Sequence, residues 1–205
     1  MTSARLGSAA AALVAAIGAT YVVVLAVGIS RYGLSRPIAD PVLAVMEALT
    51  LLAAPALVVA MAAVREWAPP ERRLTATAAL AFAVIFAGIT SVVHFVELTA
   101  VRQLGGGGMA WPSAPYAAEL LAWDWFLGLA LLFAAPAFQA DRGRERRVRR
   151  AFVASGALAL AGTAGPLLGD MRLQRLGIAG YAVVLPVAFF WLARLLRATP
   201  RAGPA

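Results

Sequence analysis

The chain has 205 residues, of which 62% are hydrophobic and 14% are charged, and its formal net charge is +8. Soluble globular proteins are about 25% charged, so this composition excludes the ordinary soluble classes and indicates a membrane protein. The positive charge comes from arginines that fall mostly at the ends of apolar runs, where they orient a chain in a bilayer. We therefore do not expect binding to nucleic acid. The chain contains neither Cys nor Lys, which excludes disulfides, thiolate metal sites and Schiff-base chemistry.

Six apolar runs follow one another, each close to the ~20 residues that cross ~30 Å of hydrocarbon at ~1.5 Å per residue. They predict an all-α polytopic membrane protein, a six-transmembrane-helix bundle that forms one domain over residues 1–205. The predicted spans lie at approximately 8–29, 41–64, 74–99, 115–139, 150–169 and 176–197.

The arginines predict the orientation of this bundle. Alternate connections share a side of the membrane, which places thirteen arginines on the side of the two termini and five on the other. Positive loops stay in the cytoplasm, so we expect an inner-membrane protein with both termini cytoplasmic. The six arginines from Arg142 to Arg150 determine topology in this interpretation, and they could also contact anionic lipid. The bilayer is the one partner that we expect, and no oligomeric state is indicated.

Ionisable and polar residues concentrate at one depth, in the extracytoplasmic half of the predicted bundle. Charge in hydrocarbon is costly and is usually functional. The candidate ligand- or proton-binding residues are Glu47, His94, Glu97 and Asp124 on the second, third and fourth spans. Secondary candidates are Thr90, Ser91, Tyr116, Glu119, Trp123 and Trp125, and the expected rim consists of Asp40, Arg102, Asp170 and Arg172.

Helical phase separates these candidates. Residues three, four or seven apart share a helix face, so His94 and Glu97 form a stripe with Thr90 and Ser91. Glu119 and Asp124 are five apart and point about 140° from each other. We expect Asp124 to face the interior and Glu119 to reach the outer interface. At the rim we expect Asp170 and Arg172 to pair with Arg102 or Asp40.

Clustered carboxyl groups in a desolvated site can hold protons, because burial and neighbouring carboxylates both raise a carboxylate pKa. The leading hypothesis is an outward-facing acidic pocket, containing one His, that binds and moves a small cationic or amphipathic molecule with proton coupling. One alternative is an intramembrane enzyme that acts on a lipid through these carboxylates and His94, which we favour less because no nucleophile motif accompanies them. The other is a structural or accessory subunit whose polar layer specifies helix packing.

We expect no cofactor. The minor alternative is a divalent metal held by His94, Glu97, Glu47 and Asp124, which offer one nitrogen and up to three carboxylates. Di-metal carboxylate bundles use two Glu-x-x-His pairs, whereas this chain has a single His.

Three stretches resemble those of bacterial multi-pass membrane proteins. They are PVLAVMEALTLLAAP at 41–55, HFVELTAVRQ at 94–103 and LLAWDWFLGLALLFAAPAF at 120–138. The resemblance implies the fold and a bacterial source, and it implies no activity.

Overall fold

The computed structural model describes residues 3–33, 36–105 and 110–198, and within these ranges every regular element is helical. Six helices are long and apolar enough to cross a membrane. The predicted all-α architecture, with six helices long and apolar enough to span a membrane, is therefore confirmed for the described residues. We refer to these six helices as spans 1 to 6. Arg201, one of the thirteen arginines of the topology argument, lies outside the described residues.

The six spans have the following bounds. Span 1 is α1 (Ser3–Tyr32) and span 2 is α2 (Val42–Trp67). Span 3 joins η1 (Pro70–Arg72), α3 (Arg73–Val96) and the π-helical η2 (Glu97–Val101). Span 4 joins α4 (Ala114–Leu120), the π-helical η3 (Leu121–Leu127), α5 (Gly128–Ala134) and η4 (Ala135–Ala137). Span 5 joins α6 (Gly143–Gly162) and α7 (Ala164–Leu168), and span 6 joins α8 (Met171–Ile178), the π-helical η5 (Ala179–Val184) and α9 (Leu185–Ala198).

Span 5 begins earlier than its hydropathy predicted. Helix α6 starts at Gly143, not near residue 150, so the arginine-rich segment is helical. Arginine is a strong helix former, and the apolar run marks only the part of a helix that is buried in hydrocarbon. The Glu145 carboxylate accepts a hydrogen bond from the Gln139 backbone N–H at 2.7 Å, which ties the start of α6 to the preceding connection.

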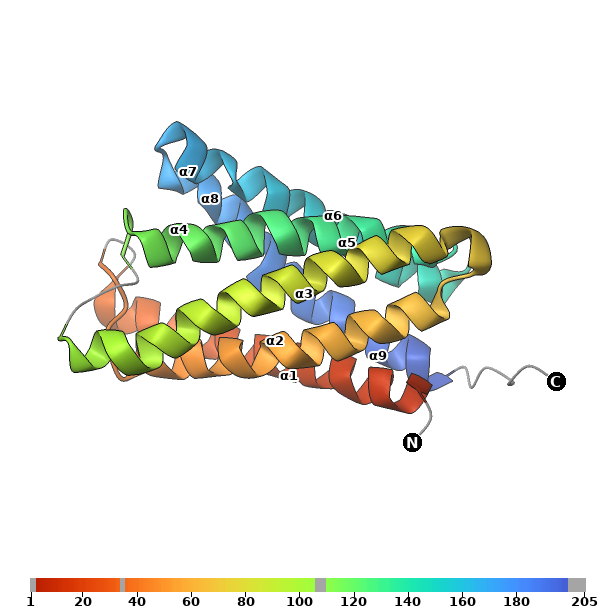
Figure 1. Cartoon of the computed structure of the whole chain (residues 1–205), viewed down its shortest axis with the longest axis horizontal. Helices are drawn as coiled ribbons and strands as arrows, with labels where there is room; N and C mark the ends of the chain where they lie inside the picture. The colour runs from red at the N-terminus through yellow and green to blue at the C-terminus, as the bar shows by residue number, and fades with distance from the viewer. Residues whose placement is uncertain (1–2, 34–35, 106–109, 199–205) are drawn as a thin grey trace.

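The spans form a ring in which each packs against its neighbours in the chain. Helix α1 packs on α2, α2 on α3, α3 on α5 and α5 on α6, and α9 closes the ring by packing on both α6 and α1. The described beginning of α1 and end of α9 lie at the same end of the bundle (Figure 1). We call this the arginine end, since α6 also begins there with its arginines, and we call the opposite end, where Asp40 and Arg102 lie, the polar end.

The two halves of the bundle are filled differently. The arginine-end half holds an apolar core in which small alanines let the helices approach and aromatic rings fill the remaining space. It includes Ala60, Ala79, Ala83, Ala134, Phe152 and Phe189. Large apolar side chains on the outside of the bundle are exposed, among them Val23, Leu52, Val92 and Phe95 at 60% or more. Exposed apolar surface of this extent is typical of a multi-pass membrane protein, whose outer surface meets lipid.

Candidate functional site

Buried polar side chains gather in the polar-end half of the bundle. All five ionisable residues that the sequence placed at one depth come from spans 2 to 4. Four of them have almost no exposure: Glu47 at 1%, His94 at 5%, Glu97 at 3% and Asp124 at 0%. Glu119, the fifth, is 8% exposed. The contacts divide them into three groups, each with different neighbours.

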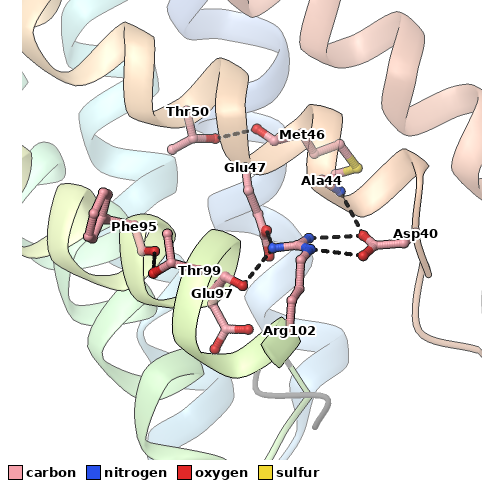
Figure 2. A network of polar contacts seen from close by, with 9 residues as sticks. All are labelled: Asp40, Ala44, Met46, Glu47, Thr50, Phe95, Glu97, Thr99 and Arg102. Atoms are coloured by element: carbon pink, nitrogen blue, oxygen red, sulfur yellow. Dashed lines mark hydrogen bonds and ion pairs between the residues drawn. The ribbon is translucent and has the colours of Figure 1, made fainter. Parts of the chain in front are cut away.

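Arg102 organises the first group, between spans 2 and 3 (Figure 2). Its Nε and Nη2 donate to the two carboxylate oxygens of Asp40 at 2.8 and 2.9 Å. Its Nη1 lies 2.7 Å from Oε2 of Glu47 and donates to the Glu97 backbone oxygen at 2.6 Å. The guanidinium hydrogen bond holds the pKa of the Asp40 carboxyl below its usual value. One arginine thus joins an exposed acid, a buried acid and the start of η2.

The rim pairs differently from the prediction. We expected Asp170 and Arg172 to pair with Arg102 or Asp40. Instead Arg172 donates to Asp170 at 2.9 Å, at the start of α8, while Arg102 holds Asp40. Asp170 caps α8 by accepting the Arg172 backbone N–H, so this pair is local helix capping.

The second group surrounds Glu119. The Thr90 hydroxyl donates to Oε1 at 2.7 Å, His94 Nε2 lies 2.7 Å from the same oxygen, and the Trp123 indole N–H also reaches it. The predicted excursion of Glu119 to the outer interface is therefore wrong. Span 4 is covered on one side by span 3 and on the other by spans 5 and 6, so two side chains that point far apart are both buried.

Asp124 forms the third group, within the π-helical η3. Its carboxyl is fully buried, as the sequence predicted, but it faces spans 5 and 6. A Cβ at Gly162 would stand 2.9 Å from Asp124 Oδ1, and one at Gly177 would collide with it. Neither carboxyl oxygen has a partner with hydrogen-bond geometry, and the nearby Gln174 amide donates to the Tyr181 hydroxyl at 2.8 Å. Asp124 is thus packed against glycine backbone on neighbouring spans.

Four further buried atoms lack a hydrogen-bond partner: Glu47 Oε1, Glu47 Oε2, Glu97 Oε1 and His94 Nδ1. Of these, only Glu47 Oε2 has an ion-pair contact, with Arg102. The Glu97 carboxylate turns away from the Arg102 guanidinium (Figure 2), which binds only the backbone oxygen of that residue. The three side chains interact electrostatically with one another. A neutral His94 that donates from Nε2 to a carboxylate leaves Nδ1 as an acceptor. The site between Glu47, His94 and Glu97 therefore contains acceptor atoms to which no side chain of the described residues donates a hydrogen bond.

The other secondary candidates lie at the edge of these groups. Ser91 is half-buried, Trp125 is 46% exposed, and the ring of Tyr116 lies 6.2 Å from that of Trp111. Sequence reasoning missed Gln174 and Tyr181, whose spacing of seven residues on one helix face was the available indication. The Tyr181 ring lies 5.0 Å from Trp123, which connects the second and third groups.

The arrangement of the His, Asp and Glu side chains does not indicate a metal site. In the part of the chain that the structure describes, no three His, Asp or Glu side chains form a group that could hold a metal ion. The alternative in which His94, Glu97, Glu47 and Asp124 share a metal gains no support, since Asp124 packs against other spans.

No known family model matches the chain, and no curated protein or solved structure is significantly similar to it. The fold alone does not imply a function, so function is argued from the contacts of the polar end.

Proposed function

We propose that the chain is a bacterial inner-membrane protein that binds and moves a small cationic or amphipathic molecule with proton coupling at the polar end. The arginine asymmetry supports an orientation with both termini in the cytoplasm. In that orientation the polar end faces the extracytoplasmic side, where the exposed carboxylate of Asp40 lies.

The unpartnered acceptors of Glu47, Glu97 and His94 carry this proposal. A buried carboxylate without a compensating positive charge costs free energy. The nearby cation, Arg102, is shared between Glu47 and Asp40 and does not contact the Glu97 carboxylate. The free-energy cost of burying these acceptors falls when they take up a proton or when a cation binds between them. Since both events satisfy the same atoms, a proton and a cationic ligand compete, and that competition is the physical basis of exchange.

Glu47 and Glu97 differ in what holds them. Glu47 has an ion pair with Arg102, whereas the Glu97 carboxylate turns away from that guanidinium. We assign Glu97 the exchanging role and Glu47 the role of a fixed neighbour that makes the site acidic. His94 Nδ1 is a second position for a proton, beside a ring whose other nitrogen is already bonded to Glu119.

The Glu119 group supports the structural alternative for part of the layer. Thr90 and His94 of span 3 contact its carboxylate across the boundary with span 4, as interhelical hydrogen bonds for packing do. The Trp123 indole N–H adds a contact within span 4. We therefore assign Glu119 to helix packing and restrict the exchanging site to Glu47, His94 and Glu97.

Vesicles reconstituted with the full chain and loaded with a pH-sensitive dye test this proposal. Tetraphenylphosphonium, choline and spermidine are added outside as separate cationic probes. We expect at least one of them to drive proton efflux from vesicles with the wild-type chain. Glu97→Gln should reduce that efflux to the rate of protein-free vesicles, because glutamine keeps the shape but binds no proton.

Glu145→Gln is the matched control, since Glu145 is also buried, at 6% exposure, but lies at the arginine end. It should exchange at the wild-type rate. Wild-type activity in Glu97→Gln contradicts the assigned role of Glu97, and a wild-type chain that equals empty vesicles for all three probes contradicts the proposed function.

A further inference from the structure

A groove runs along the outside of the bundle between α1 and α9, and none of its lining residues belongs to the polar-end groups. Its volume is about 690 Å³, within the range of small-molecule sites. Small residues of α1 form one wall (Ala12, Ala15, Ala16, Ala19) and apolar residues of α9 form the other (Pro186, Val187, Phe190, Trp191). The groove is open to the surroundings of the bundle, which for this apolar surface is hydrocarbon.

Contacts between the two helices define the extent of the groove. Near the arginine end the Ser8 hydroxyl donates to the Ala193 backbone oxygen at 2.9 Å. At the other limit α1 and α9 meet closely, since a Cβ at Gly18 would stand 2.6 Å from the Pro186 ring. From Ser8 to Ala19 is eleven residues, or ~16 Å at ~1.5 Å per residue. This length is about half of the ~30 Å hydrocarbon core, the reach of an acyl chain in one leaflet.

Charge is present only at the arginine end of the groove. Arg194 and Arg197 are its charged lining residues, and they are three apart, on one face of α9. Among the described residues no carboxylate pairs with either of them. Arg147 of α6 packs over one of the lining residues, with its Cζ 4.8 Å from the ring centre of Trp191. The guanidinium groups of Arg194 and Arg197 therefore border the headgroup end of an apolar groove of leaflet length.

We propose that this groove is a binding site for an anionic phospholipid. One acyl chain lies between α1 and α9, and the phosphate is held by Arg194 and Arg197. Guanidinium groups bind phosphate oxygens through paired N–H donors, and basic pockets between transmembrane helices are typical sites for anionic headgroups. The proposed site is on α9 and is distinct from the lipid contact that the sequence suggested for Arg142–Arg150, and the inference does not depend on the polar-end site.

Lipid titration of the purified full chain tests the site. Phosphatidylglycerol and phosphatidylcholine are compared as additives in detergent, with binding followed by native mass spectrometry. We expect the wild-type chain to prefer phosphatidylglycerol. The double variant R194Q/R197Q should lose about thirtyfold in affinity for it, since each basic residue contributes about 1 kcal/mol near the surface and 1.4 kcal/mol corresponds to tenfold.

R72Q/R73Q is the control variant, because it removes the same charge from exposed positions outside the groove. An equal loss in this control means that binding is diffuse electrostatic attraction and overturns the proposal. Ala16 is an exposed residue in the apolar part of the groove. Ala16→Phe fills that part and leaves the charge unchanged, so it should also weaken phosphatidylglycerol binding. An unchanged affinity in this variant overturns the proposed site as well.

The chain lacks cysteine, so Ala16→Cys provides a single thiol inside the groove. We expect no disulfide-linked dimer on oxidation in membranes, because lipid occupies the groove. Efficient cross-linking identifies the groove as an interface between two copies and overturns the lipid proposal.

Discussion

Removal of the Arg102 side chain should destabilise the protein mainly through one of its two acidic partners. Asp40 exposes 49% of its side chain, and such exposed pairs contribute about 0–1 kcal/mol. Glu47 exposes 2% of its side chain, so Arg102→Met leaves a buried carboxylate without its cation. Removing one partner of a buried pair costs about 3–5 kcal/mol. The Arg102 side chain is itself 25% exposed, so we expect the lower end, about 3 kcal/mol.

A double-mutant cycle separates this electrostatic cost from lost packing. The free energy of unfolding is measured by titration of mixed micelles with sodium dodecyl sulfate for wild type, Arg102→Met, Glu47→Gln and the double variant. Because Glu47→Gln removes the buried charge, the double variant should be more stable than Arg102→Met alone, with a coupling energy of about 1–3 kcal/mol. A coupling energy near zero refutes the argument, and Asp40→Asn as a control should cost under about 1 kcal/mol.

Two further predictions concern the rim and the crossing of spans 4 to 6. Because the pKa of Asp40 is lowered in the folded protein, its stabilising contribution is present above its unfolded pKa of about 3.9 and is lost as pH falls through the folded pKa. The difference in melting temperature between wild type and Asp40→Asn should accordingly be constant near neutrality and shrink in acid; a difference that grows in acid contradicts the sign. Gly177→Ala should lower the free energy of unfolding by about 1–3 kcal/mol in the same micelle titration, because the added Cβ collides with the Asp124 carboxyl. In a chain that also carries Asp124→Ala, the same substitution should lower it much less. Gly88→Ala, which meets open space, should be neutral or stabilising by up to about 1 kcal/mol; equal losses at the two glycines would contradict the crowding argument.

Helical phase predicted directions correctly but could not predict what lies in each direction. The five-residue separation of Glu119 and Asp124 implied that they face different neighbours, and they do: Glu119 bonds to span 3 and Asp124 packs on spans 5 and 6. The expectation that one direction leads to the outer interface was wrong. It assumed that span 4 has one buried side, whereas a span with neighbours on both sides buries side chains over most of its circumference.

Pairing at the polar end shows the same limit. Sequence reasoning placed Asp40 and Arg102 at one depth and identified both as rim residues. It could not predict that Arg102 also reaches Glu47 and the Glu97 backbone oxygen, since that depends on the angle at which spans 2 and 3 meet. The hydropathy of the sequence likewise does not predict the π-helical turn that begins at Glu97.

The sequence by itself determined the six helices, the apolar arginine-end half, the acidic polar-end half and the arginine asymmetry. These properties follow from length and hydropathy measured against a bilayer of known thickness, a comparison that needs no tertiary contact. The tertiary structure decided which acid faces which partner, that span 6 closes the ring against span 1, and that a leaflet-length groove with arginines at one end lies between them. Each of these features depends on which faces of different helices are in contact. The periodicity of a sequence describes the faces of one helix and does not say which other helix each face contacts.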